Sequence, residues 1–504
     1  MTEFGTAASR FVLSQWFFRL GIALTILIHL PFLNRPPESI HVWRQCLTLG
    51  VARNLFTESM NLFEPKVDNR RGTNGITGSH FLSYEFALAS IYHLTGEQNW
   101  VHRCFSLLLY LLGAWGMYYL LLLITKNEWI GRLSFWGFLW SPELFYQGIN
   151  AMPDILALTA SIWGLYYFLQ YLFGITQNKP PNYTAFLLGL LLITLGGLTK
   201  LQYLAVGFPI VGFLLVFLKQ IKLRNWMEMT VFGIISVSIP LLWYRYAMNL
   251  TENSHLAEFG LELRPVDTLS EAMSVLSQNL VSDIPETIMN YANFTLFLIG
   301  LFFCFRLQKW KHPIFLPFLI LSLGLLAYHL IELSQMKAHI YYMMPYFFVL
   351  LPIAGYGGYQ LQQRGWILAL CLLLFLQPVL CSIRILPARW LNPEKWVPTE
   401  LYEAESRQRL IDAVPEGEEV IMAVDASNCI YFYFLNKKGY GVSYSGELFK
   451  PYKESTLLNR YWQQGARYIY TDDPSFLQQP QLKGLLQEVL LTEGRFKVLK
   501  LKEK

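Results

Sequence analysis

The chain has 504 residues, of which 54% are hydrophobic and 15% are charged, with a formal net charge of +5 at pH 7. An average soluble domain has about 25% charged residues, so the composition excludes a disordered chain, a fibrous repeat and an ordinary soluble enzyme. The chain has no basic arm, which argues against a nucleic acid partner. The composition therefore indicates a polytopic α-helical membrane protein whose first partner is the lipid bilayer.

About eleven segments are apolar and long enough to span a membrane, which takes about 20 residues in a helix. Lys and Arg gather in one set of the short loops, which predicts a cytoplasmic N-terminus and places the polar segments 34–103, 248–290 and 387–504 on the outer side. The eleven segments are 12–33, 104–124, 129–147, 154–174, 183–199, 202–218, 226–247, 291–307, 313–332, 339–358 and 366–386.

The residues after 386 have the pattern of a small α/β domain. We therefore divide the chain into a transmembrane domain, 1–386, which includes the outer loops, and an outer domain, 387–504. Strands are predicted at 418–424, 440–444 and 466–473, helices at 455–464 and 480–490, and an edge strand at 495–501.

The segment 38–56, directly after the first span, predicts an amphipathic helix in the outer interface. Trp43, Leu47, Val51 and Leu55 share one helical face, and polar residues that include Arg44 lie on other faces. A plain interfacial anchor, with Arg44 on a lipid phosphate, explains the pattern as well.

The loop 63–85 combines cations, glycines and one aspartate. Lys66, Arg70 and Arg71 surround Asp68, and Gly72, Gly75 and Gly78 follow. Glycines let a backbone turn sharply and approach a ligand closely. Asp68 is either a base that its neighbours keep ionised or one half of a structural ion pair.

Four more ionisable residues stand at the predicted outer ends of spans: Asp154, Lys200, Lys337 and His339. Asp154 also suits a helix cap, Lys200 a snorkelling lysine, and His339 a satisfied interface histidine. On one membrane face, carboxylates and cations of this kind bind a lipid-linked phosphate and activate an acceptor.

Six short motifs carry a resemblance to a known family: HVWRQ, EPKVDNRRG, GITG, MPD, GLTK and HIYYMMP. Over roughly residues 12–360 the chain resembles the GT-C membrane glycosyltransferases. It is most similar to the bacterial protein O-mannosyltransferase and aminoarabinose lipid A transferase superfamily, which is like glycosyltransferase family 39. The tail resembles the outer α/β domain of many such bacterial proteins.

The resemblance implies inverting transfer of a sugar from a polyprenyl phosphate to a hydroxyl of a glycan, lipid or protein acceptor. It places the reaction on the outer face of the bacterial cytoplasmic (inner) membrane. In this family an acidic residue of the first outer loop usually serves as base, and Lys200 matches the lysine near the donor phosphate. Many relatives have Glu-Phe-Pro where this chain has His80-Phe81-Leu82, which makes the nearby Glu85 a substitute.

These arguments assign three sets of site residues. No cofactor is certain, and a divalent metal between the two aspartates stays open. The catalytic set is Asp68, Asp154 and Glu85; the donor-phosphate set is Lys200, Arg44, Arg70, Lys337 and His339; the substrate set is Gln45, His80, Tyr203 and Tyr342.

Two other classes of function remain open: a membrane transporter, and a non-catalytic assembly protein of cell-envelope glycan export. Intramembrane charges also mark transport pathways, but transporters often contain internal repeats, and the sequence has no convincing repeat. The replacements at His80 and Leu82 keep the non-catalytic class open.

Overall fold

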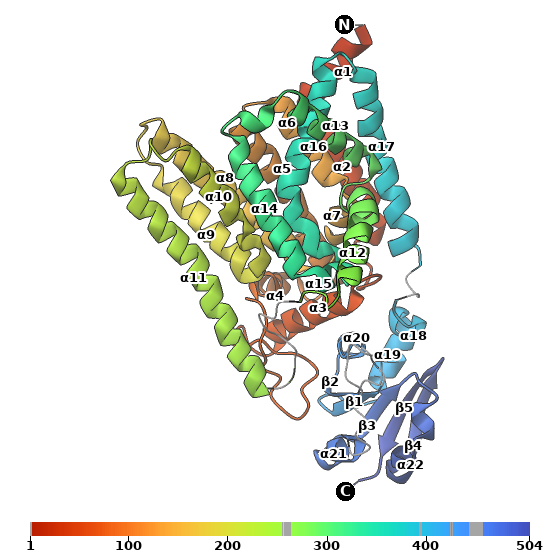
Figure 1. Ribbon diagram of the computed structural model, residues 1–504. Coiled ribbons are helices and arrows are strands. Elements are labelled where there is room, and N and C mark those ends of the chain that lie inside the picture. The colour runs from red at the N-terminus through yellow and green to blue at the C-terminus, as the bar shows by residue number, and fades with distance from the viewer. Residues whose placement is uncertain are drawn as a thin grey trace. The chain divides into compact units, whose positions relative to one another are not determined.

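The computed structural model in Figure 1 describes residues 3–254, 256, 264–392, 396–423, 425, 427–442 and 457–503. The chain forms two compact units. The helical unit comprises Met1–Leu33, His102–Tyr244 and Leu261–Ala388, and the mixed unit comprises Asn34–Val101, Arg245–Gly260 and Arg389–Lys504. Contacts therefore group residues 34–101 with the C-terminal residues, while the domain division at residue 386 stays a prediction.

The helical unit consists of α-helices joined by short 3-10 and π segments, and two of its helices, α5 and α11, continue into the mixed unit. The elements are α1 (Glu3–Leu13), α2 (Gln15–His29), η1 (Leu30–Phe32), α5 (Asn99–Thr125), α6 (Glu128–Leu139), α7 (Pro142–Gln147), α8 (Pro153–Thr176), α9 (Tyr183–Thr199), η2 (Leu201–Val206), α10 (Gly207–Val216), α11 (Leu223–Ser254), α12 (Leu269–Gln278), η3 (Asn279–Ile288), α13 (Tyr291–Arg306), η4 (Lys309–Lys311), α14 (Phe315–Ile331), α15 (Leu333–Ala338), η5 (Ile340–Tyr346), α16 (Phe347–Gln363), α17 (Ile367–Ile385) and η6 (Leu386–Trp390).

Six helical stretches among the described residues are long and apolar enough to cross a membrane, which confirms a polytopic helical membrane protein. A bent pair, Leu269–Ile288 with Tyr291–Arg306, adds a seventh if it is one span. Each of the eleven predicted segments is helical in the structure, and the number of spans beyond these stays a prediction. The six stretches are Gln15–Phe32, Asn99–Thr125, Pro153–Thr176, Leu223–Ser254, Ile340–Gln363 and Ile367–Trp390.

The predicted span at 129–147 is divided between α6 and α7. Pro142 occupies the first turn of α7, where its missing N–H costs nothing, and the Ser141 hydroxyl accepts the N–H of Leu144 at 3.3 Å. A proline one residue after a capping serine therefore starts a new helix and does not continue the old one.

Helices α8 and α9 pack closely because glycines face the neighbouring helix. A Cβ on Gly164 would lie 2.7 Å from Ile193 Cγ1, and one on Gly196 would lie 2.3 Å from Ser161 Oγ. Small residues allow such approach between membrane helices. The short connection makes the two helices antiparallel, so the start of α8 and the end of α9 lie at the same end of the unit.

The mixed unit joins two helices of the first loop to a five-stranded sheet. The strand order is β2-β1-β3-β5-β4, in which β1 is parallel to β2 and β3, and β5 is antiparallel to β3 and β4. The elements are α3 (Val42–Thr57), α4 (Ser83–Thr95), α18 (Thr399–Tyr402), α19 (Ala404–Asp412), β1 (Glu419–Ala423), α20 (Ile430–Leu435), β2 (Lys438–Val442), α21 (Leu457–Gln463), β3 (Tyr468–Thr471), η8 (Phe476–Gln478), α22 (Pro480–Leu485), β4 (Leu486–Glu493) and β5 (Phe496–Leu501).

The structure confirms the predicted α/β tail with two corrections. The segment 495–501 is β5, which lies between β3 and β4, so the predicted edge position is wrong. The predicted helix at 480–490 ends at Leu485, and the following residues form the edge strand β4 because pairing with β5 outweighs their helical spacing. Of the predicted strand 440–444, Ser443 and Tyr444 lie outside the described residues.

The first loop is attached to the sheet at β2. The Gly439 N–H donates to the Asp68 carbonyl at 3.0 Å, and the Arg70 N–H donates to the Gly439 carbonyl at 2.7 Å. The Asn69 side chain accepts the Gly441 N–H at 2.9 Å. These bonds satisfy backbone groups that an edge strand would leave open, and they fix the backbone of Asp68.

Helix α3 forms where the sequence predicts it, but it has no exposed polar face. Gln45, Thr48 and Asn54 are buried together with Val51 and Leu55. Both α4 and α20 pack against α3, so its polar residues lie within the mixed unit. The prediction of an amphipathic helix is therefore wrong, while its location in the outer interface stays a prediction.

Candidate functional site

At one end of the helical unit a buried carboxylate meets a lysine. Asp154 is in the first turn of α8, directly after Pro153, and its side chain is fully buried. Lys200 has extended backbone between α9 and η2, and its Nζ lies 3.5 Å from Asp154 Oδ2. Gln202 donates to the other carboxylate oxygen at 3.5 Å. A buried carboxylate needs such a cation to stay ionised.

Tyr203 connects this ion pair to the segment before α16. Its side chain is fully buried, and its hydroxyl donates to Met344 Sδ at 3.6 Å, which joins η2 to η5. The start of α8 also contacts η5. The structure therefore brings Asp154, Lys200 and Tyr203 together with η5, which contains most of the predicted motif HIYYMMP at 339–345.

Lys337 and His339 precede η5, but Lys337 already has a carboxylate partner. Its Nζ lies 3.1 Å from Glu271 Oε1, and both side chains are exposed. The His339 ring stacks on Tyr341 and Tyr342, with centroids 5.6 and 6.0 Å away. The phosphate role of Lys337 and His339 and the substrate role of Tyr342 stay predictions.

In the mixed unit, Asp68 faces helix α3. The Asn54 amide donates to Asp68 Oδ1 at 2.8 Å, and a Cβ on Gly50 would lie 2.8 Å from Asp68 Oδ2. Burial raises the pKa of Asp68, although the charge of Arg53 and the Asn54 hydrogen bond act in the opposite direction. Asp68 is therefore a desolvated carboxylate whose nearest partner is a neutral amide.

Glu58, and not Asp68, is the carboxylate that the loop cations surround. Lys66 Nζ lies 3.2 Å from one Glu58 oxygen, and Arg70 and Lys438 both bond to the other. Burial alone would raise the pKa of Glu58, but the bonds from Lys438 and Arg70 lower it to about 2. The prediction that the loop cations keep Asp68 ionised is therefore wrong.

The loop glycines have the conformational and steric roles that the sequence predicts. Gly72 and Gly75 have φ of +78° and +81°, which other residues rarely adopt. At Gly78 a Cβ would lie 2.0 Å from the Ala247 carbonyl oxygen. These glycines make the turns that carry the chain from Asp68 to α4.

His80 stands where many relatives in the resembled family have a glutamate. It lies between Glu85 and Arg44. His80 Nε2 is 2.9 Å from Glu85 Oε1, and His80 Nδ1 is 3.2 Å from an Arg44 NH2 group. Both His80 and Glu85 are buried. Burial alone would raise the pKa of Glu85, but His80 and then Arg44 hold it below its usual value. Nearby, Gln45 is fully buried and donates to the Glu38 carbonyl at 3.0 Å.

Three paired polar residues were not among the predicted site residues: Asn54, Glu58 and Arg103. Arg103 is fully buried at the start of α5 and donates to Asn150 Oδ1 at 3.0 Å. An arginine directly before an apolar run was an available signal for Arg103. Asn54 and Glu58 gave no such signal, because their partners come from distant parts of the chain.

The described residues contain no group of three or more His, Cys, Asp or Glu side chains arranged to hold a metal ion. The divalent metal between the two aspartates therefore stays a prediction.

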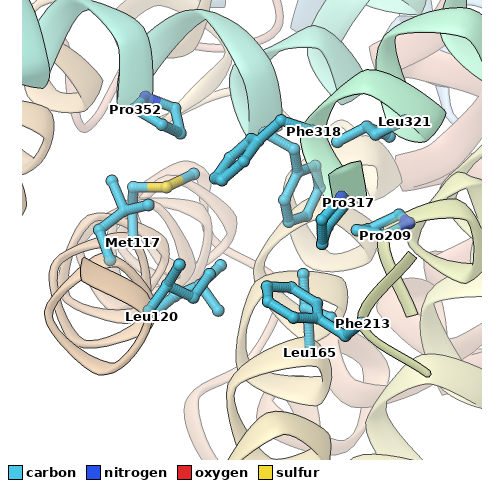
Figure 2. Close-up of a pocket in the computed structure, with 12 residues that line it drawn as sticks. Met117, Leu120, Leu165, Pro209, Phe213, Pro317, Phe318, Leu321 and Pro352 are labelled. Carbon is cyan, nitrogen blue, oxygen red and sulfur yellow. The ribbon is translucent and has the colours of Figure 1, made fainter. Parts of the chain in front are cut away.

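An apolar pocket of about 20 Å³ lies inside the helical unit, between α5, α8, α10, α14 and α16. Figure 2 shows Met117 and Leu120 on one side, with Phe213, Pro317 and Phe318 opposite them. The lining side chains are entirely hydrocarbon and thioether, and the space is about that of one or two water molecules, so the pocket is a small packing void.

No protein-family model matches the sequence, and no curated protein matches it significantly. Solved structures do match. ArnT from Cupriavidus metallidurans bound to undecaprenyl phosphate aligns over 97% of this chain and 98% of its own, with a TM-score of 0.63 and 12% identity. The fold is that of ArnT. The apo structure of ArnT matches over 95% and 97% of the two chains, with a TM-score of 0.61 and 12% identity.

A second enzyme has a related fold. The oligosaccharyltransferase from Archaeoglobus fulgidus, in complex with Zn and sulfate, aligns over 90% of this chain and 67% of its own, with a TM-score of 0.56 and 9% identity. Together with ArnT, it confirms the predicted GT-C-like fold of a multi-pass membrane protein. At these identities the likeness concerns the fold alone.

Proposed function

We propose that this protein is a glycosyltransferase that moves a sugar from a polyprenyl phosphate to an acceptor hydroxyl on the outer face of a bacterial inner membrane. The observation that carries the proposal is the match to ArnT with bound undecaprenyl phosphate, which extends over nearly the whole of both chains.

In the proposed reaction, a base removes the proton of the acceptor hydroxyl. The oxygen forms a bond to the anomeric carbon of the sugar, and the bond from that carbon to the phosphate oxygen breaks. The electron pair stays on the phosphate, which leaves as polyprenyl phosphate with an additional negative charge. Attack from the opposite side inverts the anomeric carbon. A cation on the phosphate favours this step because it stabilises the charge that develops there.

We assign the leaving phosphate to Lys200. Its ammonium group is largely buried, and Asp154 holds it at 3.5 Å. A lysine ammonium carries a full positive charge and three N–H donors, and both properties suit a phosphate oxygen. In this proposal Asp154 positions Lys200 and keeps it charged, and it takes no proton from the acceptor.

We assign the base to Asp68. A general base works best when its pKa is close to the working pH, and burial moves the pKa of Asp68 upward. Glu85 has the opposite shift because of His80 and Arg44, which makes it a weaker base. The neutral partner of Asp68, Asn54, leaves the second carboxylate oxygen able to accept a proton.

The test is transfer of radiolabelled sugar in proteoliposomes that contain the full chain and a panel of undecaprenyl-phosphate hexoses and pentoses. We expect transfer by the wild type and about tenfold weaker donor binding by Lys200→Ala, since a hydrogen bond to a charged group contributes about 1.5–3 kcal/mol. Lys219→Ala is the matched control, because Lys219 is an exposed lysine of the same unit in the turn before α11. Transfer by neither protein with any donor would contradict the proposal.

A further inference from the structure

A second, larger pocket lies in the helical unit, at the end of α8 opposite Asp154, where α11 begins (Figure 1). Its volume is about 280 Å³, and one water molecule needs about 10–15 Å³ of such space, so the pocket has room for a group of several heavy atoms. The lining includes three cations and two amides: Lys179, Lys222, Arg224, Asn178 and Asn225. A lining of this kind suits an anion.

Two of the three cations have no counter-charge. Arg224 Nε lies 3.6 Å from Glu228 Oε1, and one of its terminal nitrogens donates to the Tyr183 hydroxyl at 3.3 Å. Lys179 and Lys222 are exposed, and in the part of the chain that the structure describes their ammonium groups make no hydrogen bond or ion pair. The pocket therefore carries a surplus of positive charge.

The nearby carboxylate, Glu228, is occupied by other partners. It accepts hydrogen bonds from the Tyr183 hydroxyl and the Asn225 amide, both at 3.1 Å, and from the Tyr171 hydroxyl. These bonds join α8, α9 and α11, and Asn225 is buried among them. Glu228 therefore holds the walls of the pocket together and leaves the charge of the two lysines uncompensated.

The backbone that carries the two lysines is fixed. Asn178 has φ of +58°, and the Lys179 N–H donates to the Gly174 carbonyl at 3.1 Å, which makes the turn that ends α8. Two prolines with restricted φ follow this turn. Lys222 stands directly before α11, and the first N–H groups of a helix have no acceptor within it and attract anions.

Membrane orientation alone does not explain this arrangement. An excess of Lys and Arg in the loops of one side sets the orientation of a membrane protein, and any basic loop residue serves that purpose. Lys219 is such a residue: it is exposed and stands three positions before Lys222, but it does not line the pocket. The convergence of the other cations on one cavity is an additional property.

The position of the pocket favours a lipid over a soluble anion. Helix α8 is apolar enough to cross a membrane, and its 24 residues extend over about 35 Å, which exceeds the hydrocarbon thickness of about 30 Å. The pocket at its end therefore lies at the level of the lipid headgroups. Basic pockets between membrane helices at this level bind the phosphate of anionic lipids.

We propose that this pocket binds the phosphate group of an anionic phospholipid, with the phosphate oxygens on Lys179 and Lys222. The lipid neutralises the two ammonium groups and ties the end of α8 to the start of α11. The inference goes beyond the proposed function and does not depend on it, because Lys200 and this pocket lie at opposite ends of α8.

The experiment measures binding of dioctanoyl phosphatidylglycerol to the full chain in a nonionic detergent. Lys179→Ala and Lys222→Ala should each weaken binding about fivefold, and together about 25-fold, since each basic residue near an anionic lipid contributes about 1 kcal/mol. Lys219→Ala is the matched control and should bind like the wild type. Dioctanoyl phosphatidylcholine, which has no net charge, should bind at least tenfold more weakly, and inorganic phosphate at constant ionic strength should not displace the lipid.

Four results overturn the inference. Unchanged binding in the double variant would remove the lysines from the site, and equal losses in Lys219→Ala and Lys222→Ala would show attraction to the total charge of the loops. Equal affinity for the two lipids would show that the acyl chains alone bind, and displacement by inorganic phosphate would assign the pocket to a soluble anion. Sugar transfer plays no part in these measurements, so a failure of the proposed function remains distinguishable.

Discussion

The two aspartates of the predicted catalytic set have contrasting surroundings. Asp154 is fully buried in the helical unit, and a lysine ammonium lies 3.5 Å from its carboxylate. Asp68 lies in the mixed unit, where its nearest partner is the neutral amide of Asn54 at 2.8 Å. In the sequence, Asp68 stands among cations, whereas Asp154 stands without a neighbouring cation at the start of an apolar run. Among the described residues, Asp154 has a cation within ion-pair distance and Asp68 has none, although the charge of Arg53 acts on Asp68 from farther away.

Asp154 is thus an acid whose charge a neighbouring cation compensates, whereas Asp68 is the candidate proton acceptor. The lysine ammonium beside Asp154 compensates the charge of its carboxylate. A carboxylate whose burial is not compensated has a raised pKa, as Asp68 does. We therefore expect changes at Asp68 to affect the chemical step, and changes at Asp154 to affect stability and donor binding.

The largest expected effect is that of Asp68→Asn on turnover. The substitution keeps the size of the side chain and removes the proton acceptor, and general-base catalysis contributes typically about 10²–10⁴-fold. The rate of sugar transfer at saturating donor should fall by about that factor, while donor affinity stays nearly unchanged. Glu85→Gln is the comparison, and it should reduce turnover much less. Full turnover in Asp68→Asn would move the base to another carboxylate.

For Asp154→Asn the expected effect is on stability, of about 3 kcal/mol, because it removes the carboxylate charge that lies 3.5 Å from the largely buried Lys200 ammonium. Denaturant unfolding in detergent measures this loss. The double variant Asp154→Asn with Lys200→Met should recover most of the stability, since no charge is then left unpaired, but it should not recover donor binding. If the two substitutions destabilise the protein additively, the carboxylate and the ammonium do not interact.

The smallest expected effect concerns Glu58 and depends on pH. Its pKa is lowered to about 2 in the folded protein, so its ion pairs stabilise the fold above pH of about 4.5 and are lost as the pH falls towards 2. Water screens these pairs, so Glu58→Gln should cost about 1 kcal/mol at pH 7 and nothing near pH 2. Glu488→Gln, on the exposed face of β4, is the control. A pH-independent loss would show that packing, and not charge, is responsible.

The features that the sequence predicted well are local ones. Apolar runs of span length became helices, Pro153 predicted the helix start that holds Asp154, and Lys200 broke the apolar pattern where α9 ends. Each of these depends on residues within one or two turns. The membrane fold and the alternation of strands and helices in the tail could be predicted for the same reason.

The errors concern contacts between distant parts of the chain. Glu58 binds Lys438, which lies 380 residues away, so the loop cations that seemed to belong to Asp68 belong to a carboxylate at the end of α3. Burial of the polar face of α3 requires α20, which the sequence did not associate with that helix. The helical spacing at 480–490 likewise gave no sign of the partner strand β5 that turns its second half into β4.

The most direct test of the account follows donor and product together in one reaction. Full-length protein in proteoliposomes would receive an undecaprenyl-phosphate sugar of known anomeric configuration, and both the released lipid phosphate and the glycosylated acceptor would be quantified. We predict one undecaprenyl phosphate released for each sugar transferred, an inverted anomeric carbon, and release that depends on the acceptor. Retained configuration would contradict the single displacement assisted by Asp68, and movement of the intact lipid-sugar across the bilayer without cleavage would contradict the enzyme itself.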